Sequence, residues 1–322
     1  MPRWLGLALR VLGTAAGVAW IALTVDLGEA RGALGRIPWS VFAVASALVA
    51  ANVVAGAVRW RVLLRAYGAT RIPRVRRLVY LYFVAFFYNN YLPGAVAGDV
   101  GRGVVTHDAF ESEGATGALA VVLVERAQGL FGLFALLAVG LVVAGNAIDS
   151  GSLWWWTALG CAGSCALVAT IPVARRLAPF LPAPLAKIAR KLPALQDPKS
   201  FVLAIGLSVV TQALIALAGW YLLAALGPIT LGASLLVVPL AAATTFLPIT
   251  VGGVGAREAV YVALGARLFG MAEADALAAS LGLWFAHLAV GAVGGLAQLI
   301  APRDALKRPT ERAPEHVPEH VP

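Results

Sequence analysis

Residues 92–102 read LPGAVAGDVGR, and residues 247–257 read LPITVGGVGAR. The two stretches align without a gap at a constant offset of 155 residues, and they share leucine, proline, valine, glycine and arginine at the same places. Each interrupts an apolar segment with proline and glycine and ends in a charged residue. Paired broken segments at matching positions of two halves indicate a transport site built from an inverted repeat. The sequence therefore predicts two related halves whose broken segments meet.

The composition is that of an integral membrane protein. Of the 322 residues, 60% are hydrophobic and only 13% are charged, and the mean hydropathy is +0.84. A soluble domain carries about 25% charged residues, so this chain lacks the polar surface to cover itself. The net charge of +9 comes largely from basic residues between the apolar segments, as expected of cytoplasmic loops. This distribution argues against nucleic acid as a partner.

The apolar segments predict an all-α integral membrane protein with about six full transmembrane helices. Two re-entrant broken-helix hairpins, arranged as an inverted repeat, complete the predicted fold. Each full helix approaches the ~20 apolar residues that cross a bilayer. The predicted spans are 5–25, 39–58, 118–145, 153–174, 200–224 and 275–300. The broken segments are 78–110 and 234–270.

The basic residues fix the predicted orientation. If the arginine-rich stretch 59–77, loop 175–199 and the tail are cytoplasmic, segment 78–110 starts and ends inside. By the same reasoning, segment 234–270 starts and ends outside. One hairpin then dips into the membrane from each face, and the two halves run in opposite senses.

This orientation implies a single membrane domain over residues 1–300. Its halves, about 1–145 and 153–300, are joined by the basic loop 175–199. The tail 301–322 is rich in proline and charge, which predicts a disordered cytoplasmic segment. We expect the protein to lie in the cell membrane with both termini in the cytoplasm.

The broken segments carry the candidate chemistry. Pro93 and Pro248 end their helices, and the exposed amides of the returning half-helices can hold an anion. Ionisable groups within a membrane are costly and face a cavity or a partner. The candidate substrate-binding residues are Asn89, Asn90, Pro93, Gly94, Asp99, Arg102, Glu125, Arg126, Gln128, Pro248, Gly252, Gly253, Arg257 and Glu258. The alternative is that the charged residues form internal salt bridges that pin the hairpins, and both roles are compatible.

Other polar residues receive structural interpretations. Arg59-Trp60-Arg61 follows the second predicted span and is typical of an interfacial anchor that closes a helix. Glu125 and Gln128 are three residues apart and are expected to share a helix face. Cys161 and Cys165 are expected to be small buried hydrophobic residues rather than a disulfide or metal pair.

Several of these motifs resemble one membrane-protein family. The chain is similar to the lysylphosphatidylglycerol synthase transmembrane-region family, also called flippase-like or YbhN-like proteins, over about residues 5–300. The residues that carry the resemblance are Arg59-Trp60, Asn89-Asn90-Tyr91-Leu92-Pro93-Gly94, Gly98-Asp99, Arg102, Glu125-Arg126 and the stretch from Leu247 to Glu258.

The resemblance implies lipid movement. In the larger synthases, a membrane domain of this kind moves aminoacylated phosphatidylglycerol between leaflets, and a separate cytoplasmic domain makes that lipid. This chain ends about twenty residues after its last predicted helix, so we expect no aminoacyl-transfer domain.

Three functions are compatible with the sequence. The first is a flippase for an anionic phospholipid or a polyprenyl-phosphate-linked lipid, in which Arg102 and Arg257 neutralise the phosphate. Asp99, Glu125 and Glu258 would then pair with the arginines, contact a cationic headgroup or carry a coupling proton. The second is a polyprenyl-carrier-dependent glycosyltransferase or other transferase. Asp99 and Glu125 could serve as its carboxylates, although the sequence contains no convincing Asp-x-Asp pair, His-rich ligand set or Ser/His/Asp order. The third is a membrane anchor for an envelope-biosynthesis enzyme. No cofactor or metal is expected.

Overall fold

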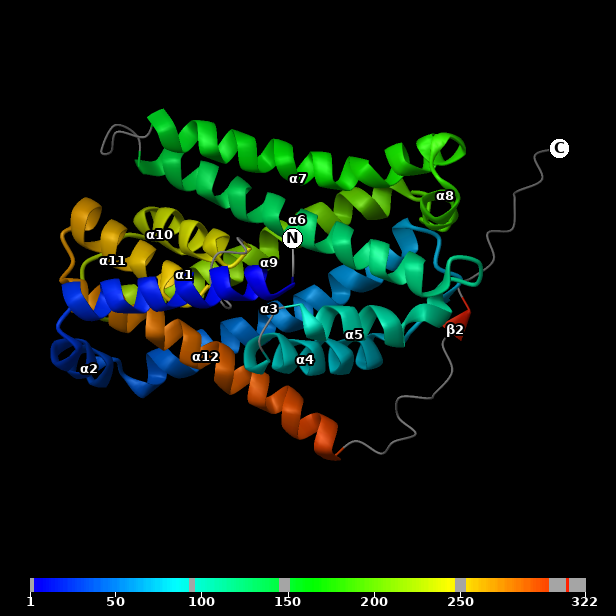
Figure 1. Ribbon diagram of the computed structural model, residues 1–322. Coiled ribbons are helices and arrows are strands. Elements are labelled where there is room, and N and C mark those ends of the chain that lie inside the picture. The colour runs from blue at the N-terminus through cyan, green and yellow to red at the C-terminus, as the bar shows by residue number, and fades with distance from the viewer. Residues whose placement is uncertain (1–2, 93–95, 145–150, 247–252, 301–310, 313–322) are drawn as a thin grey trace.

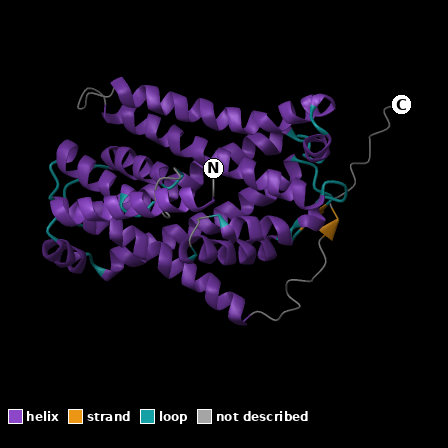
Figure 2. Ribbon diagram, viewed as in Figure 1, coloured by secondary structure: helices purple, strands orange, loops and turns teal. Residues whose placement is uncertain are grey.

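The computed structural model describes residues 3–92, 96–144, 151–246, 253–300 and 311–312. These residues form a bundle of helices, as the sequence predicts for an all-α membrane protein (Figures 1 and 2). Pro93, Gly94, Pro248 and Gly252 lie outside the described residues.

Five helices in the described part of the chain are long and apolar enough to cross a bilayer. At 1.5 Å per residue each is about 40 Å or longer, which exceeds the ~30 Å hydrocarbon core. The sixth predicted span, 5–25, coincides with α1 (Arg3–Thr24). The five long helices are α3 (Trp39–Ala66), α6 (Gly114–Ala144), α7 (Gly151–Leu177), α9 (Pro198–Ala224) and α12 (Glu273–Ile300).

The broken segments form four shorter helices. Their 9 to 17 residues give lengths of about 14 to 26 Å, too short to cross a bilayer singly. α4 packs against α5, and α10 packs against α11, so each broken segment is a pair of helices side by side. The four helices are α4 (Val75–Tyr91), α5 (Ala97–Val105), α10 (Leu231–Thr244) and α11 (Ala256–Phe269).

Short helices and strands lie at the two ends of the bundle (Figure 1). α2 lies at one end, and α8 and the strand β2 lie at the other. β1 pairs with β2 in antiparallel register, so two residues of the predicted disordered tail pair with the chain before α4. The rest of that tail lies outside the described residues. These elements are α2 (Leu27–Arg36), β1 (Arg71–Ile72), η1 (His107–Ala109), η3 (Ala178–Phe180), α8 (Ala183–Arg190) and β2 (Glu311–Arg312).

The helix order repeats at the offset of 155 residues seen in the sequence. Each of α1 to α6 has its counterpart in α7 to α12, in the same order. The packing repeats as well, because α4 lies along α12 just as α10 lies along α6. α3 packs against its own counterpart, α9. The first helix of each broken segment therefore packs against the last helix of the other half, and the second, α5 or α11, packs against the last helix of its own half.

The second long helix is longer than predicted. α3 continues eight residues beyond the expected end at residue 58. Arg59 and Trp60 are 8% and 0% exposed, so the interpretation of Arg59-Trp60-Arg61 as an interfacial anchor is wrong. Acceptor groups on neighbouring helices satisfy the buried Arg59 guanidinium, and the helix therefore does not need to end where its charge appears.

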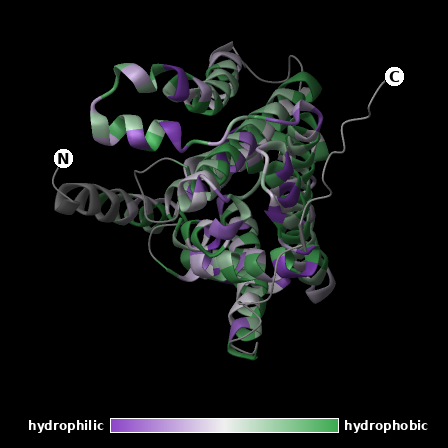
Figure 3. Ribbon diagram, turned by 90° about the vertical axis from the view of Figure 1, so that its right-hand side faces the viewer, coloured by the Kyte–Doolittle hydropathy of each residue, from purple (hydrophilic) through white to green (hydrophobic). Residues whose placement is uncertain are grey.

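The outer surface is apolar, as a lipid-facing surface requires. Figure 3 shows hydrophobic residues along most of the helices. α7 packs mainly against α6 and leaves large side chains such as Trp155 exposed. Cys161 and Cys165 are free, but Cys161 is half-buried and Cys165 is exposed, so the expectation that both are buried is wrong. The reason is that only one side of α7 is covered by protein.

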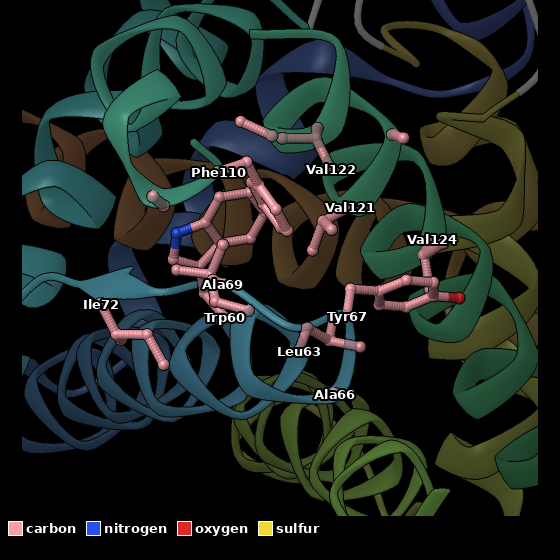
Figure 4. Packing of buried hydrophobic residues seen from close by; sticks show 14 of the residues in the cluster. Trp60, Leu63, Ala66, Tyr67, Ala69, Ile72, Phe110, Val121, Val122 and Val124 are labelled. Carbon is pink, nitrogen blue, oxygen red and sulfur yellow. The ribbon is translucent and has the colours of Figure 1, made fainter. Parts of the chain in front are cut away.

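A buried apolar cluster fastens α3 to α6 (Figure 4). Trp60, Leu63 and Tyr67 lie on or just after α3, and Val121 lies on α6. Phe110, which follows η1, completes this part of the cluster. Within a membrane, close packing of this kind holds helices together because lipid supplies no hydrophobic driving force. The cluster fixes the position of two adjacent polar residues, Arg59 on α3 and Glu125 on α6.

A glycine allows the first pair of short helices to pack closely. A Cβ atom built on Gly98 of α5 would lie 2.0 Å from the carbonyl oxygen of Ala85 on α4. The Gly98 amide also donates a hydrogen bond of 2.9 Å to Oδ1 of Asn89. A Cβ atom built on Gly101, one turn further along α5, would have no neighbouring atom within 4 Å. Of these two glycines, only Gly98 is therefore required by the packing.

We predict that Gly98→Ala destabilises the protein by about 1–3 kcal/mol, because the added methyl group must push α5 away from α4. Gly101→Ala is the matched control and should be neutral or stabilising, since alanine favours a helix over glycine by ~1 kcal/mol. Thermal unfolding in detergent micelles measures both. Equal melting temperatures for the two variants would contradict the close contact.

Candidate functional site

The two broken segments meet at one cavity of about 550 Å³. Asn89 and Asp99 line it from the first segment, and Thr245 and Arg257 line it from the second. α3, α6, α9 and α12 provide the remaining walls. The volume falls in the ~300–1,000 Å³ range of small-molecule sites. The cavity is therefore formed by both halves of the repeat.

Glu125 of α6 is the centre of a buried ionic network beside this cavity. Its Oε2 accepts a hydrogen bond of 2.7 Å from Nη2 of Arg102 on α5. Its Oε1 accepts hydrogen bonds from Arg59 of α3, at 3.2 Å from Nη2, and from the Tyr82 hydroxyl of α4. The Glu125 side chain is only 2% exposed, so these donors replace the water that an ionised carboxylate needs. One carboxylate thus joins four helices.

Asp99 extends the network toward the open part of the cavity. Its Oδ1 accepts from Nη2 of Arg102 at 2.9 Å, and its Oδ2 accepts from Nη2 and Nε of Arg126 at 2.6 and 3.0 Å. The Arg126 side chain is 30% exposed, whereas that of Arg102 is 2% exposed. Arg126 is therefore the member of this network that a ligand in the cavity can reach most easily.

The Arg102 guanidinium is held between two aromatic rings. Its central carbon lies 4.3 Å from the Trp60 ring centroid and 4.2 Å from the Tyr82 ring centroid. Such cation–π contacts contribute about 2 kcal/mol or more when desolvated. Stacking and two carboxylates fix this cation in place. Arg102 is therefore better suited to holding the network together than to binding a mobile ligand.

In the second half, the geometry of the backbone positions the charged pair Arg257 and Glu258. Gly253 and Gly255 have φ angles of +80° and +85°, which side-chain-bearing residues rarely adopt. The Gly255 amide begins α11 and donates a hydrogen bond of 2.7 Å to Oε2 of Glu258. Oε1 of Glu258 accepts from Nε of Arg257 at 2.9 Å. Glu258 therefore caps the helix and orients Arg257, and Arg257 alone of the pair lines the cavity.

Uncharged polar residues complete the cavity wall. Asn90 donates its side-chain amide to the carbonyl oxygen of Phe86, which stacks on His287 with ring centroids 5.7 Å apart. Nδ1 of His287 lies 2.8 Å from the Leu283 carbonyl oxygen. Gln212 of α9 also lines the cavity. Among the described residues, no group of three or more His, Cys, Asp and Glu side chains could hold a metal ion.

The structure brings most of the predicted site residues together. Seven of them line the cavity: Asn89, Asn90, Asp99, Arg102, Glu125, Arg126 and Arg257. Gly253 lies in the turn before α11, and Glu258 lies in the first turn of α11, where it contacts Arg257. Gln128 lies apart, at a second cavity on the other side of α6. It does not line the first cavity together with Glu125, the residue with which it was expected to share a face.

Sequence reasoning missed Arg59 and Tyr82, which contact Glu125 directly. A signal for Arg59 exists in the sequence. Asn52, Gly56 and Arg59 follow one another at helical spacing, and all three line the cavity. These three residues continue one helix face past the predicted end at residue 58. That spacing would have placed Arg59 within the helix rather than after it.

Residues 4–295 match the model of the family described as lysylphosphatidylglycerol synthase TM region. The chain belongs to this family. Together with the apolar helices, membership establishes a multi-pass membrane protein. A search of curated proteins finds no matching relative.

We predict that Glu125→Gln costs about 3–5 kcal/mol of stability, because the buried Arg59 loses its counter-charge and Arg102 keeps only that of Asp99. Arg59→Gln should also destabilise, and the double variant should lose less than the sum by at least ~1 kcal/mol, since the two groups contact each other. Denaturant unfolding in micelles measures the cycle.

The control for this cycle is Glu111→Gln, which removes an exposed ion pair with Arg71 at 3.3 Å. Exposed pairs contribute only ~0–1 kcal/mol, so this variant should unfold like the wild type. If Glu125→Gln were no more destabilising than Glu111→Gln, the buried network would not hold the helices together.

Proposed function

We propose that this protein is a lipid flippase-like transporter that moves an anionic phospholipid, or a lipid-linked phosphate, between leaflets. The observation that carries this proposal is the charge of the shared cavity. Four guanidinium groups and three carboxylates lie in the cavity or in direct contact with its lining, which leaves one positive charge. The groups are Arg59, Arg102, Arg126, Arg257, Asp99, Glu125 and Glu258. A phosphodiester headgroup carries the complementary single negative charge.

The exposure of the arginines suggests their roles. Arg126 of α6 and Arg257 of α11 are partly exposed cations that line the cavity from different halves, with side chains 30% and 13% exposed. Both are ion-paired, so a phosphate would compete with Asp99 and Glu258 for guanidinium groups already in place. Arginine suits this task because its planar fork binds phosphate oxygens in pairs. Arg102, which the sequence suggested as a phosphate ligand, is assigned to the framework instead.

The fold supports alternating access. Short helices that enter a membrane from opposite faces leave backbone groups at mid-depth, which is tolerated only inside protein or beside a wet cavity. We place α4 and α5 as a re-entrant hairpin from the side of α8, and α10 and α11 as one from the side of α2. With the basic loops in the cytoplasm, the α8 side and the chain termini face inward in the cell membrane. Rocking of one half against the other then exposes the cavity to each leaflet.

The same geometry disfavours a transferase. A general base needs a carboxylate that is free to accept a proton from the substrate. Both candidate carboxylates of the first half are already engaged, Asp99 by Arg102 and Arg126, and Glu125 by Arg59, Arg102 and Tyr82. Carboxylates that are already paired with arginines in this way are suited to recognising charge rather than to moving protons.

We predict that purified protein in liposomes accelerates the movement of fluorescent phosphatidylglycerol between leaflets, and acts much less on zwitterionic phosphatidylcholine. Arg257→Gln and Arg126→Gln should each slow this movement about tenfold or more, because a charge-assisted hydrogen bond contributes about 1.5–3 kcal/mol. Dithionite quenching of the outer-leaflet probe measures the rate.

Arg31→Gln serves as the control, since Arg31 is an exposed arginine of α2 away from both cavities. It should leave the rate unchanged. Equal rates with empty liposomes, or unchanged rates for both cavity variants, would remove the basis of the proposal. Size-exclusion profiles show whether each variant is folded.

A further inference from the structure

A second cavity, of about 620 Å³, lies between α6, α7 and α9 near α8. It shares no lining residue with the first cavity. Its wall is mostly apolar and includes Phe131 of α6, Val168 of α7 and Ile205 of α9. Along α7 it extends from Ser164 to Arg176, which is about 18 Å at 1.5 Å per residue. It has the proportions of a slot for an alkyl chain.

Gln128 is an unsatisfied polar group in the wall of this slot. The residue is 2% exposed, and neither its amide oxygen nor its amide nitrogen has a hydrogen-bond partner among the described residues. A buried amide without partners costs roughly 1–3 kcal/mol for each unmet group. A ligand that offers a carbonyl or hydroxyl group in an otherwise apolar setting would recover this loss.

One end of the slot is positively charged. Arg175 and Arg176, at the end of α7, both line the cavity, and its described lining contains no acidic residue. Arg175 is positioned by a hydrogen bond from Nη1 to the Leu192 carbonyl oxygen, and Arg176 is exposed. Basic groups at the end of a transmembrane helix attract anionic lipid headgroups. A cationic mouth above an apolar slot is complementary to an amphiphile with an anionic head.

We propose that this cavity binds one anionic diacyl phospholipid as a resident ligand, separate from the transported one. The phosphate binds at Arg175 and Arg176, a carbonyl or hydroxyl group of the lipid pairs with Gln128, and an acyl chain lies against Phe131 and Val168. The lipid reaches the slot from the bilayer, because α7 packs mainly against α6 and is otherwise exposed. This inference does not depend on transport through the first cavity.

The chain contains a natural probe of this site. Cys165 is exposed and lines the second cavity, whereas Cys161, one turn earlier on α7, does not line it. A bound lipid should slow alkylation of Cys165 by N-ethylmaleimide and leave the rate at Cys161 unchanged. At a lipid concentration of ten times Kd, the protection should be about tenfold. Mass spectrometry of the detergent-solubilised full chain measures both rates.

Control lipids and variants distinguish binding of an anionic lipid at Arg176 from other causes of protection. Phosphatidylglycerol should protect Cys165, and phosphatidylcholine and inorganic phosphate alone should not. Arg176→Gln should abolish most of the protection, whereas Arg257→Gln in the first cavity should retain it. Equal protection by phosphatidylcholine, protection by phosphate alone, or full protection in Arg176→Gln would each overturn the proposal.

Gln128→Leu separates a ligand contact from a packing role. Without lipid, this variant should unfold at the same or a higher temperature, since an apolar side chain of similar size removes an unmet polar group. With phosphatidylglycerol, its protection of Cys165 should fall several-fold below the wild type. Undiminished protection in Gln128→Leu would show that the amide does not contact the lipid.

Discussion

The hydrogen bonds to the Glu125 carboxylate are the interaction on which the rest of the first half depends. An ionised group this deeply buried persists only when its charge and lone pairs are matched by donors. Arg59, Tyr82 and Arg102 supply those donors from α3, α4 and α5. The short helices of the first broken segment are therefore fixed to the long helices by charge as well as by apolar contact. Close packing at Gly98 then sets the distance between α4 and α5.

The two halves repeat in packing but differ in chemistry. In the second half, the charged pair is organised by backbone geometry, because Gly255 adopts a positive φ and Glu258 accepts its amide hydrogen bond. A Cβ atom on Gly255 would also lie 2.9 Å from Gly17, so α1 of the first half packs closely against this turn of the second half. The result is an asymmetric cavity. Arg102 is immobilised on one side, while Arg257 remains partly accessible on the other.

The sequence predicts the order of the helices better than the positions of the charges. The offset between LPGAVAGDVGR and LPITVGGVGAR anticipates five of the six helix pairs, because a repeated chain repeats its local breaks, but the short pair α2 and α8 was not predicted. Arg59 was misplaced because its partner Glu125 is 66 residues away and no local pattern reveals it. Gln128 was misplaced because residues three apart on a helix still differ in direction by about 60°. Because α6 forms the wall between the two cavities, this difference is enough for Glu125 to line one cavity and Gln128 the other.

α6 forms that wall, and its two faces have opposite chemistry. Arg126 lines the charged cavity, and Phe131 and Gln128 line the apolar slot. A ligand shifts a conformational equilibrium only by its difference in affinity for the two states. A lipid held between α6 and α7 can therefore influence the first cavity only if α6 changes position during transport. Because Glu125 ties α6 to the broken segment, such a movement would carry α4 and α5 with it. The resident lipid would then favour whichever arrangement binds it more tightly.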